Sequence, residues 1–168
     1  MANSTKLGLM ADTHENLPLI ARAVRLFNEE EVDLVLHGGD FISPITAGEL
    51  KKLDAELVGV FGNNDGDRLF LRQKFEEEGI GRIERDPYQF ELEGTPITLM
   101  HQPKFLDLFA ERGKRELVVW GHTHEVDLQE GPPLIINPGE CCGLLTGEAT
   151  VALVGLPELE ARIVRLDD

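Results

Sequence analysis

The sequence predicts an α/β protein folded as one domain over residues 1–168. In the first half of the chain, short apolar runs with strand character alternate with amphipathic segments of helical spacing, which indicates a parallel sheet with helices packed on it. The second half is rich in short apolar strands separated by Gly and Pro turns. No linker, low-complexity tract or internal repeat divides the chain, and its length suits one domain with a substantial core.

Each predicted strand of the first half is followed by a predicted helix. Pro18 opens the first helical segment, and Gly79 closes the third. Ser43 is expected to cap the second helix, with Pro44 at its first position. The strands are predicted at residues 6–12, 32–40 and 55–62, and the helices at residues 17–31, 43–53 and 67–79.

The second half of the chain is predicted to consist mainly of strands. Residues 88–94 alternate in polarity and turn at Gly94 into residues 95–101, which predicts a hairpin. A helix is expected around residues 105–113. The further strands are predicted at residues 116–121, 126–129, 133–137, 149–155 and 159–166.

The formal net charge of −15 argues against a protein that holds long nucleic acid through phosphate contacts. The Glu runs at 29–31 and 76–78 are interpreted as solvated helix ends. No apolar stretch approaches the roughly 20 residues of a membrane helix, and the first residues lack the apolar core of a signal peptide, so we expect a cytoplasmic protein. The adjacent Cys141 and Cys142 lack the spacing of a zinc ribbon and are interpreted as small residues in a reducing compartment.

Polar side chains that suit a metal site follow five of the predicted strands. In an α/β sheet, ligands bind outside the carboxyl ends of the strands. Four of the five His lie at these ends, and His37 lies beside one of them. The strand ends read Asp12-Thr13-His14, Gly38-Gly39-Asp40, Gly62-Asn63-Asn64-Asp65, His101 and Gly121-His122-Thr123-His124.

Each of these groups has an ordinary structural explanation when it is taken alone. Asp12 and Thr13 could cap the following helix, the Gly-Asn-Asp sequences are common in turns, and a lone His101 would more often be a hydrogen-bonded core residue than a ligand. Independent turn preferences would not place all of them in this order with strands between. The combination therefore predicts a dinuclear metal site with the ligands Asp12, His14, Asp40, Asn63, His101, His122 and His124.

The donor types indicate which ions would bind and what they would do. Mixed nitrogen and oxygen donors suit Mn, Fe, Ni or Zn better than Mg or Ca, and we expect two ions, Mn²⁺ or Ni²⁺ before Fe or Zn. Asp40 can bridge two ions, and a pair about 3.5–4 Å apart lowers the pKa of a shared water and clamps both oxygens of an in-line displacement. The neutral Asn63 keeps the site positive enough to accept a phosphate.

The ordered motifs DTH (12–14), GGD (38–40), GNND (62–65), MH (100–101) and GHTH (121–124) resemble those of the calcineurin-like metallophosphoesterases. The size and spacing are similar to the small single-domain phosphodiesterases of archaea and bacteria. Because INPGECCGLLTG (136–147) is also similar to a segment of one archaeal subgroup, the resemblance covers nearly the whole chain. It implies a four-layer αββα sandwich, two mixed β-sheets flanked by helices, with the β-rich C-terminal half forming the second sheet.

The resemblance also implies how the ligands are shared between the two ions. The first ion would take Asp12, His14, Asp40 and His124, and the second Asp40, Asn63, His101 and His122, with Asp40 bridging. The nucleophile of this family is a hydroxide that bridges the metals, so no protein side chain attacks the phosphorus.

Two positions depart from the pattern of many relatives. Asn64 stands where many relatives have a His that protonates the leaving group, and Asp65 stands where an Asp orients that His. We assign Asp40, Asn64 and Asp65 to catalysis, although Asn64 cannot act as that acid. Gln102-Pro103 replaces a Gly-His pair, which puts a substrate contact in doubt. The roles of His37 and of the INPGECC turn stay open.

The expected function is metal-dependent hydrolysis of small phosphodiesters. The alternatives are a phosphomonoesterase or nucleotidase using the same site, and a non-catalytic interaction scaffold, because the retromer scaffold subunit has this fold. The complete set of competent ligands favours an enzyme. The expected partners are a small phosphodiester substrate and, if the chain forms a homo-oligomer, further copies of itself; neither long nucleic acid nor a membrane is expected.

Overall fold

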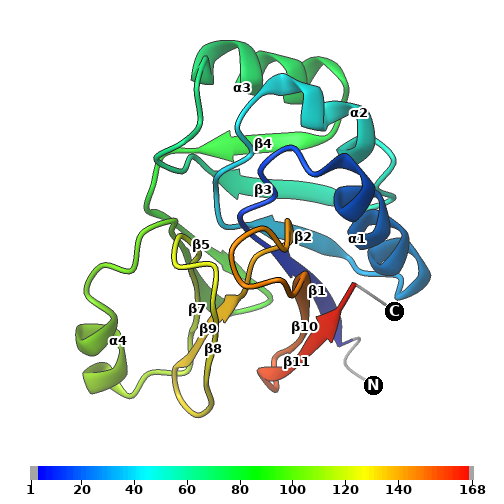
Figure 1. The fold of residues 1–168 in the computed structure, drawn as a ribbon. Helices are drawn as coiled ribbons and strands as arrows, with labels where there is room; N and C mark the ends of the chain where they lie inside the picture. The colour runs from blue at the N-terminus through cyan, green and yellow to red at the C-terminus, as the bar shows by residue number, and fades with distance from the viewer. Residues whose placement is uncertain (1–3, 167–168) are drawn as a thin grey trace.

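The computed structural model describes residues 4–166, so the outermost residues of the predicted domain, 1–3 and 167–168, lie outside it. Two mixed β-sheets pack face to face, with helices on their outer faces (Figure 1). The predicted α/β class and the four-layer arrangement are confirmed. In the described part of the chain, no helix is long and apolar enough to cross a membrane.

The first sheet contains six strands, and four of them are parallel. In spatial order they are β11 (Glu160–Arg165), β10 (Thr150–Leu156), β1 (Thr5–Met10), β2 (Leu34–His37), β3 (Glu56–Val60) and β4 (Gly81–Glu84). The helices α1 (Leu17–Glu29), α2 (Ala47–Leu50) and α3 (Arg68–Glu77) cover its outer face (Figure 1).

The second sheet contains five strands. In spatial order they are β5 (Tyr88–Leu92), β6 (Thr95–Leu99), β7 (Leu117–Val119), β9 (Leu134–Pro138) and β8 (Val126–Gln129). The predicted hairpin is present as β5 and β6, which turn through Glu93 and Gly94, both with positive φ. The helix α4 (Leu106–Arg112) covers the outer face through Phe109, which packs in a cluster with Trp120.

The core between the two sheets explains the apolar character of the central strands. Leu7 and Leu9 of β1 face the second sheet, whereas Met10 packs on the helical side. Both faces of β1 are therefore buried, and its sequence is nearly continuous apolar rather than alternating. The polar motifs follow the ends of these buried strands.

Three details differ from the sequence-based expectations. The predicted helix 43–53 is a 3₁₀ turn (Pro44–Thr46) followed by a single turn of α-helix, although Ser43 does accept a hydrogen bond from Ile45 N as its cap. The strand β4 was not predicted, because this edge strand carries polar residues. The expectation that the C-terminal half forms the second sheet is wrong for β10 and β11: β10 is buried and pairs with β1, an inner strand of the first sheet, and β11 pairs with β10.

Candidate metal centre

The predicted ligands lie on loops that follow β1, β2, β3, β6 and β7, so both sheets contribute to one site. Five of these seven residues have positive φ, a backbone conformation that costs a non-Gly residue roughly 1–3 kcal/mol. Such strain persists where the surrounding structure enforces it, commonly at functional sites. The strained residues are Asp12, His14, Asp40, His122 and His124.

One ligand group is formed by Asp12, His14, Asp40 and His124, whose donor atoms all lie within 4.8 Å of one another. His14 Nε2 lies 3.3 Å from Asp40 Oδ2, and His124 Nε2 lies 3.6 Å from Asp12 Oδ1. Asp12 Oδ1 and His14 Nε2 are buried without a hydrogen-bond partner in the described structure. Buried polar atoms are rarely left in this state, so these atoms fit a cation between them.

A second ligand group surrounds the amide oxygen of Asn63. His101 Nε2 lies 2.8 Å and His122 Nδ1 2.9 Å from Asn63 Oδ1, and the two ring nitrogens are 3.2 Å apart. When His101 Nδ1–H donates to Gly38 O at 2.8 Å, the lone pair of Nε2 in the neutral ring faces the acceptor oxygen of Asn63. Lone pairs that converge in this way fit a cation as well.

Asp40 connects the two groups. Its Oδ2 is the atom near His14, whereas its Oδ1 lies 3.5 Å from His101 Nε2 in the second group. The carboxylate packs against Gly62, where the Cβ of any other residue would overlap Oδ1. Burial alone would raise the pKa of Asp40, but His14 and the backbone N–H of Asn64 outweigh it and hold the pKa below its usual range.

Comparison with known proteins shows the family of the chain. Residues 5–158 match the family model described as the calcineurin-like phosphoesterase superfamily domain. The chain belongs to this superfamily. The predicted family, and with it the prediction of a phosphoesterase enzyme, is confirmed.

Individual relatives of this phosphoesterase cover nearly its whole length. Phosphodiesterase MJ0936 of Methanocaldococcus jannaschii is 37% identical over 96% of this chain and 99% of its own. A solved archaeal phosphodiesterase superposes with a TM-score of 0.88 at 35% identity, covering 96% of this chain and 99% of that one. Vacuolar Protein Sorting 29 of Cryptosporidium parvum, at 18% identity, 96% coverage of each chain and a TM-score of 0.65, shares the fold.

The two other residues assigned to catalysis lie on the loop after β3. Asn64 contacts the central carboxylate twice, since its backbone N–H donates to Asp40 Oδ1 and its Nδ2 to Asp40 Oδ2, both at 2.9 Å. The buried carboxylate of Asp65 instead accepts from the backbone N–H groups of Asp40, Ile42 and Gly62. Asp65 therefore ties the loops after β2 and β3 together, and its side chain faces the backbone.

His37 forms hydrogen bonds with the loops that follow β1 and β2. Its Nδ1 accepts from Gly39 N at 3.0 Å, so the proton of the neutral ring lies on Nε2, which donates to Thr13 Oγ1 at 3.1 Å. Its ring stacks on Phe41, and burial lowers the pKa of His37 to about 3. The neutral His37 ring therefore connects Thr13, between the candidate ligands Asp12 and His14, to Gly39, which precedes Asp40.

The INPGECC segment supplies Glu140, a residue that the sequence did not identify. Glu140 is fully buried, and its Oε2 lies 2.6 Å from His124 Nδ1. Burial would raise the pKa of Glu140, but the hydrogen bonds from His124 and Thr146 lower it to about 2. The carboxylate therefore holds the proton of His124 on Nδ1 and directs the lone pair of Nε2 towards the first ligand group.

Two other residues of that segment contact the His-bearing loop or Glu140. Asn137 Nδ2 donates to Gly121 O and to Thr123 Oγ1, which fixes the loop that carries His122 and His124. The Cys142 thiol donates to Glu140 Oε2 at 3.2 Å. Both Cys are buried, and burial raises the thiol pKa values, that of Cys142 to about 12. The only sequence signal for Glu140 was that it is the one charged residue of the INPGECC segment.

Replacing Glu140 by Gln is expected to weaken metal binding at the first ligand group by about 10- to 100-fold, because supporting carboxylates of this kind contribute that much to metal affinity. The Gln side chain preserves size but no longer fixes the His124 proton on Nδ1. Competition with a fluorescent chelator measures the dissociation constant directly. Glu130→Gln, the same change at an exposed residue, serves as the control. Unchanged affinity in Glu140→Gln would contradict this role.

The pH dependence of stability is expected to differ between metal-free and metal-loaded protein. In the absence of an ion, the Asp12 and Asp40 carboxylates raise the pKa of His14 from 6.5 to about 9. Because the folded pKa exceeds the unfolded one, this stabilisation is complete below pH 6.5 and is lost as the pH rises through 9. Allowing for solvent screening at this partly exposed side chain, the loss amounts to about 1–3 kcal/mol.

Bound metal reverses this trend, since a ligating His must be deprotonated and ion binding therefore tightens as the pH rises. Urea unfolding of EDTA-treated and Mn²⁺-loaded protein between pH 6 and 9 gives both slopes. In His14→Gln the metal-free slope should be reduced. Parallel slopes for the two forms of the wild type would contradict the placement of His14 as a ligand.

Proposed function

We propose that this protein is a metal-dependent phosphodiesterase that hydrolyses small phosphodiesters at a dinuclear centre. The observation that carries the proposal is the position of Asp40, whose two carboxylate oxygens face two separate groups of converging ligand atoms. In the first group, Asp12 Oδ1 and His14 Nε2 are buried without a hydrogen-bond partner among the described residues. The first ion would be held by Asp12, His14, Asp40 and His124, and the second by Asp40, Asn63, His101 and His122. Mixed nitrogen and oxygen donors suit Mn²⁺, Ni²⁺, Fe or Zn, and we propose Mn²⁺ or Ni²⁺ as the first candidates.

The chemistry follows from what these residues arrange. Two divalent cations bound there would supply a water of lowered pKa and a positive field for the phosphate. Asp12 and Asp40 are the only charged ligands among the seven, so two divalent ions would leave the centre positive in a chain of net charge −15. Asn64 places an amide N–H beside Asp40, where it can donate to a phosphate oxygen. Glu140 and His37 keep the rings and loops in place.

The diester preference is supported by the name of the 37% identical relative, a phosphodiesterase. A phosphomonoesterase using the same centre differs only in substrate. A scaffold without catalysis is disfavoured because a binding protein has no need to keep strained backbone at five ligands. The acidic surface favours small substrates over polyanions.

Removing the metals is expected to abolish activity, and adding Mn²⁺ or Ni²⁺ should restore it. Protein treated with EDTA and then dialysed is assayed against bis(4-nitrophenyl) phosphate and 4-nitrophenyl phosphate, alone and with Mn²⁺, Ni²⁺, Zn²⁺ or Mg²⁺. We expect the diester to be cleaved faster than the monoester. Full turnover by the stripped protein, or no turnover with any ion, would refute the proposal.

A further inference from the structure

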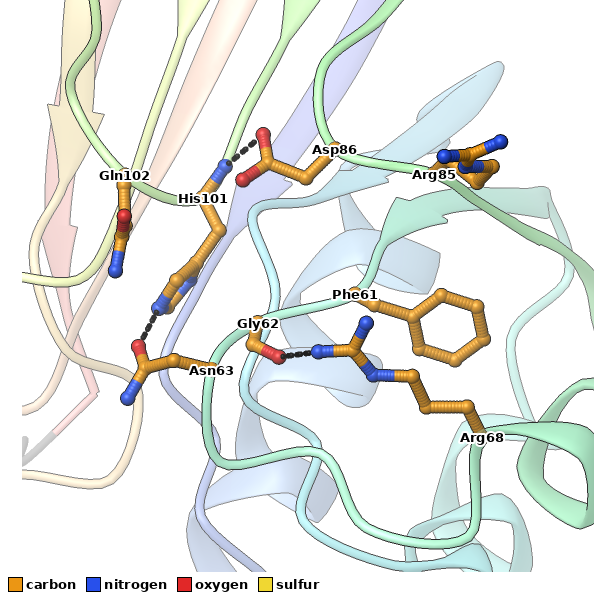
Figure 2. Close-up of a pocket in the computed structure, with 8 residues that line it drawn as sticks. All are labelled: Phe61, Gly62, Asn63, Arg68, Arg85, Asp86, His101 and Gln102. Carbon is orange, nitrogen blue, oxygen red and sulfur yellow. Dashed lines mark hydrogen bonds between the residues drawn. The ribbon is translucent and has the colours of Figure 1, made fainter.

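A pocket of about 280 Å³ opens beside the second ligand group (Figure 2). Two of its lining residues, Asn63 and His101, are the candidate ligands described above, so a phosphate held by the second ion would have one ester arm next to this pocket. Its lining residues are Phe61, Gly62, Asn63, Arg68, Arg85, Asp86, His101 and Gln102.

One wall of the pocket is a braced arginine. Arg68 donates from Nη2 to Gly62 O at 2.8 Å and from Nε to Asp65 O at 3.3 Å, and its guanidinium lies over the ring of Phe61. Figure 2 shows this group pointing towards the loop that carries Asn63. Arg68 therefore holds the loop and brings a fixed positive charge to the pocket.

The other arginine forms no salt bridge with any of the described residues. Arg85 is exposed on the segment after β4, and among residues 4–166 no carboxylate lies within salt-bridge distance of its guanidinium. Arg82, three residues earlier, is paired by contrast with Glu56 at 2.7 Å. The neighbouring Asp86 uses Oδ1 to accept from His101 N at 3.0 Å (Figure 2), and so helps to hold a candidate ligand.

The charge balance of this pocket differs from that of the molecule. Its lining carries two guanidinium groups and one carboxylate, whereas the whole chain carries 31 acidic and 16 basic residues. An unpaired Arg presents a fork of N–H donors that suits a phosphate or a carboxylate. Gln102, another lining residue, is neutral and adds no charge to the pocket.

We propose that this pocket binds an ester arm bearing a second anionic group, phosphate or carboxylate, with Arg85 as its specificity-determining contact. The proposal rests on the phosphodiesterase function proposed above and narrows it to diesters with one charged arm. The phosphate lies at the metal ligands, and the anion of the arm reaches Arg85 across the pocket formed by Phe61 and Gln102.

A set of diesters with one shared leaving group tests this assignment. Each substrate carries 4-nitrophenol on one side and, on the other, a phenyl arm with a 4-carboxylate, a 4-phosphate or a neutral 4-carboxamide. The kcat/KM of each charged substrate is divided by that of the neutral one, with Mn²⁺-loaded enzyme. We expect a ratio of roughly three- to tenfold, because the contribution of Arg85 should lie between that of an exposed ion pair and that of a charge-assisted hydrogen bond. The difference should appear mainly in KM, and added salt should reduce it.

Variants distinguish the effect of Arg85 from that of the overall electrostatic field of the protein. Arg85→Ala should bring the ratio to one or below, and Arg85→Lys should retain part of it. Arg25→Ala, the same charge change at an exposed residue of α1 outside this pocket, should keep the wild-type ratio. The larger of the two charged ratios identifies phosphate or carboxylate as the preferred group.

Failure of this inference is distinguishable from failure of the function. If the neutral-arm diester is cleaved but the wild-type ratio is one or less, or Arg85→Ala keeps the wild-type ratio, the inference is wrong and the phosphodiesterase function stands. If the loaded protein cleaves none of the three diesters, the proposed function fails and this inference fails with it.

Discussion

Asp40→Asn is expected to lower turnover of an aryl phosphodiester by more than about 10³-fold, because one carboxylate serves both ligand groups. The amide is nearly isosteric, but it cannot supply two anionic oxygens to two cations. The kcat/KM is measured with excess Mn²⁺, and circular dichroism confirms that the variant is folded.

Asp54→Asn is the matched control, since it makes the same change at an exposed residue after α2. It should retain wild-type activity. Activity of Asp40→Asn within a few-fold of the control would mean that Asp40 does not connect two ions.

The second large effect concerns the leaving group. A positioned general acid contributes roughly 10²–10⁴-fold when the leaving oxygen needs a proton. Four of the five His are candidate ligands, and both ring nitrogens of the fifth, His37, are hydrogen-bonded to Thr13 and Gly39. Asn64 offers only a neutral amide N–H. The wild type should therefore cleave aryl diesters faster than alkyl diesters by a factor of this size beyond their intrinsic difference in reactivity.

Asn64→His tests the origin of this dependence. The plot of log kcat/KM against leaving-group pKa should be steep for the wild type and shallower for the variant, at equal metal content. Asn64→Gln controls for size without adding an acid. Because the Asp65 carboxylate already accepts three backbone N–H groups, we expect only part of the full effect to be gained. Equal slopes in wild type and His variant would place the proton donor elsewhere.

The closeness of the candidate ligands at the strand ends was predictable from the sequence for a physical reason. Parallel strands end at one edge of a sheet, so residues as distant as Asp12 and His124 could be expected to meet once their strands were recognised. Local features, such as the hairpin at Gly94 and the cap at Ser43, were readable because their partners are a few residues away.

Features that depend on contacts between distant segments were not readable. Glu140 acts through His124, sixteen residues earlier, and nothing in its local sequence indicates that contact. The pairing of β10 with β1 joins the two ends of the chain, and apolar content cannot decide which sheet a strand enters. Nothing in the sequence around Arg85 indicates a binding role, and only its position in the pocket lining suggests one.

The stoichiometry of bound metal tests the dinuclear centre most directly. Protein loaded with Mn²⁺ and passed through a desalting column is measured by elemental analysis against its chain concentration. We predict two ions per chain for the wild type, one for His14→Ala and one for His101→Ala, each of which removes a ligand from a single group, and fewer than one for Asp40→Asn. One ion or none in the wild type, or two in Asp40→Asn, would contradict a centre bridged by Asp40.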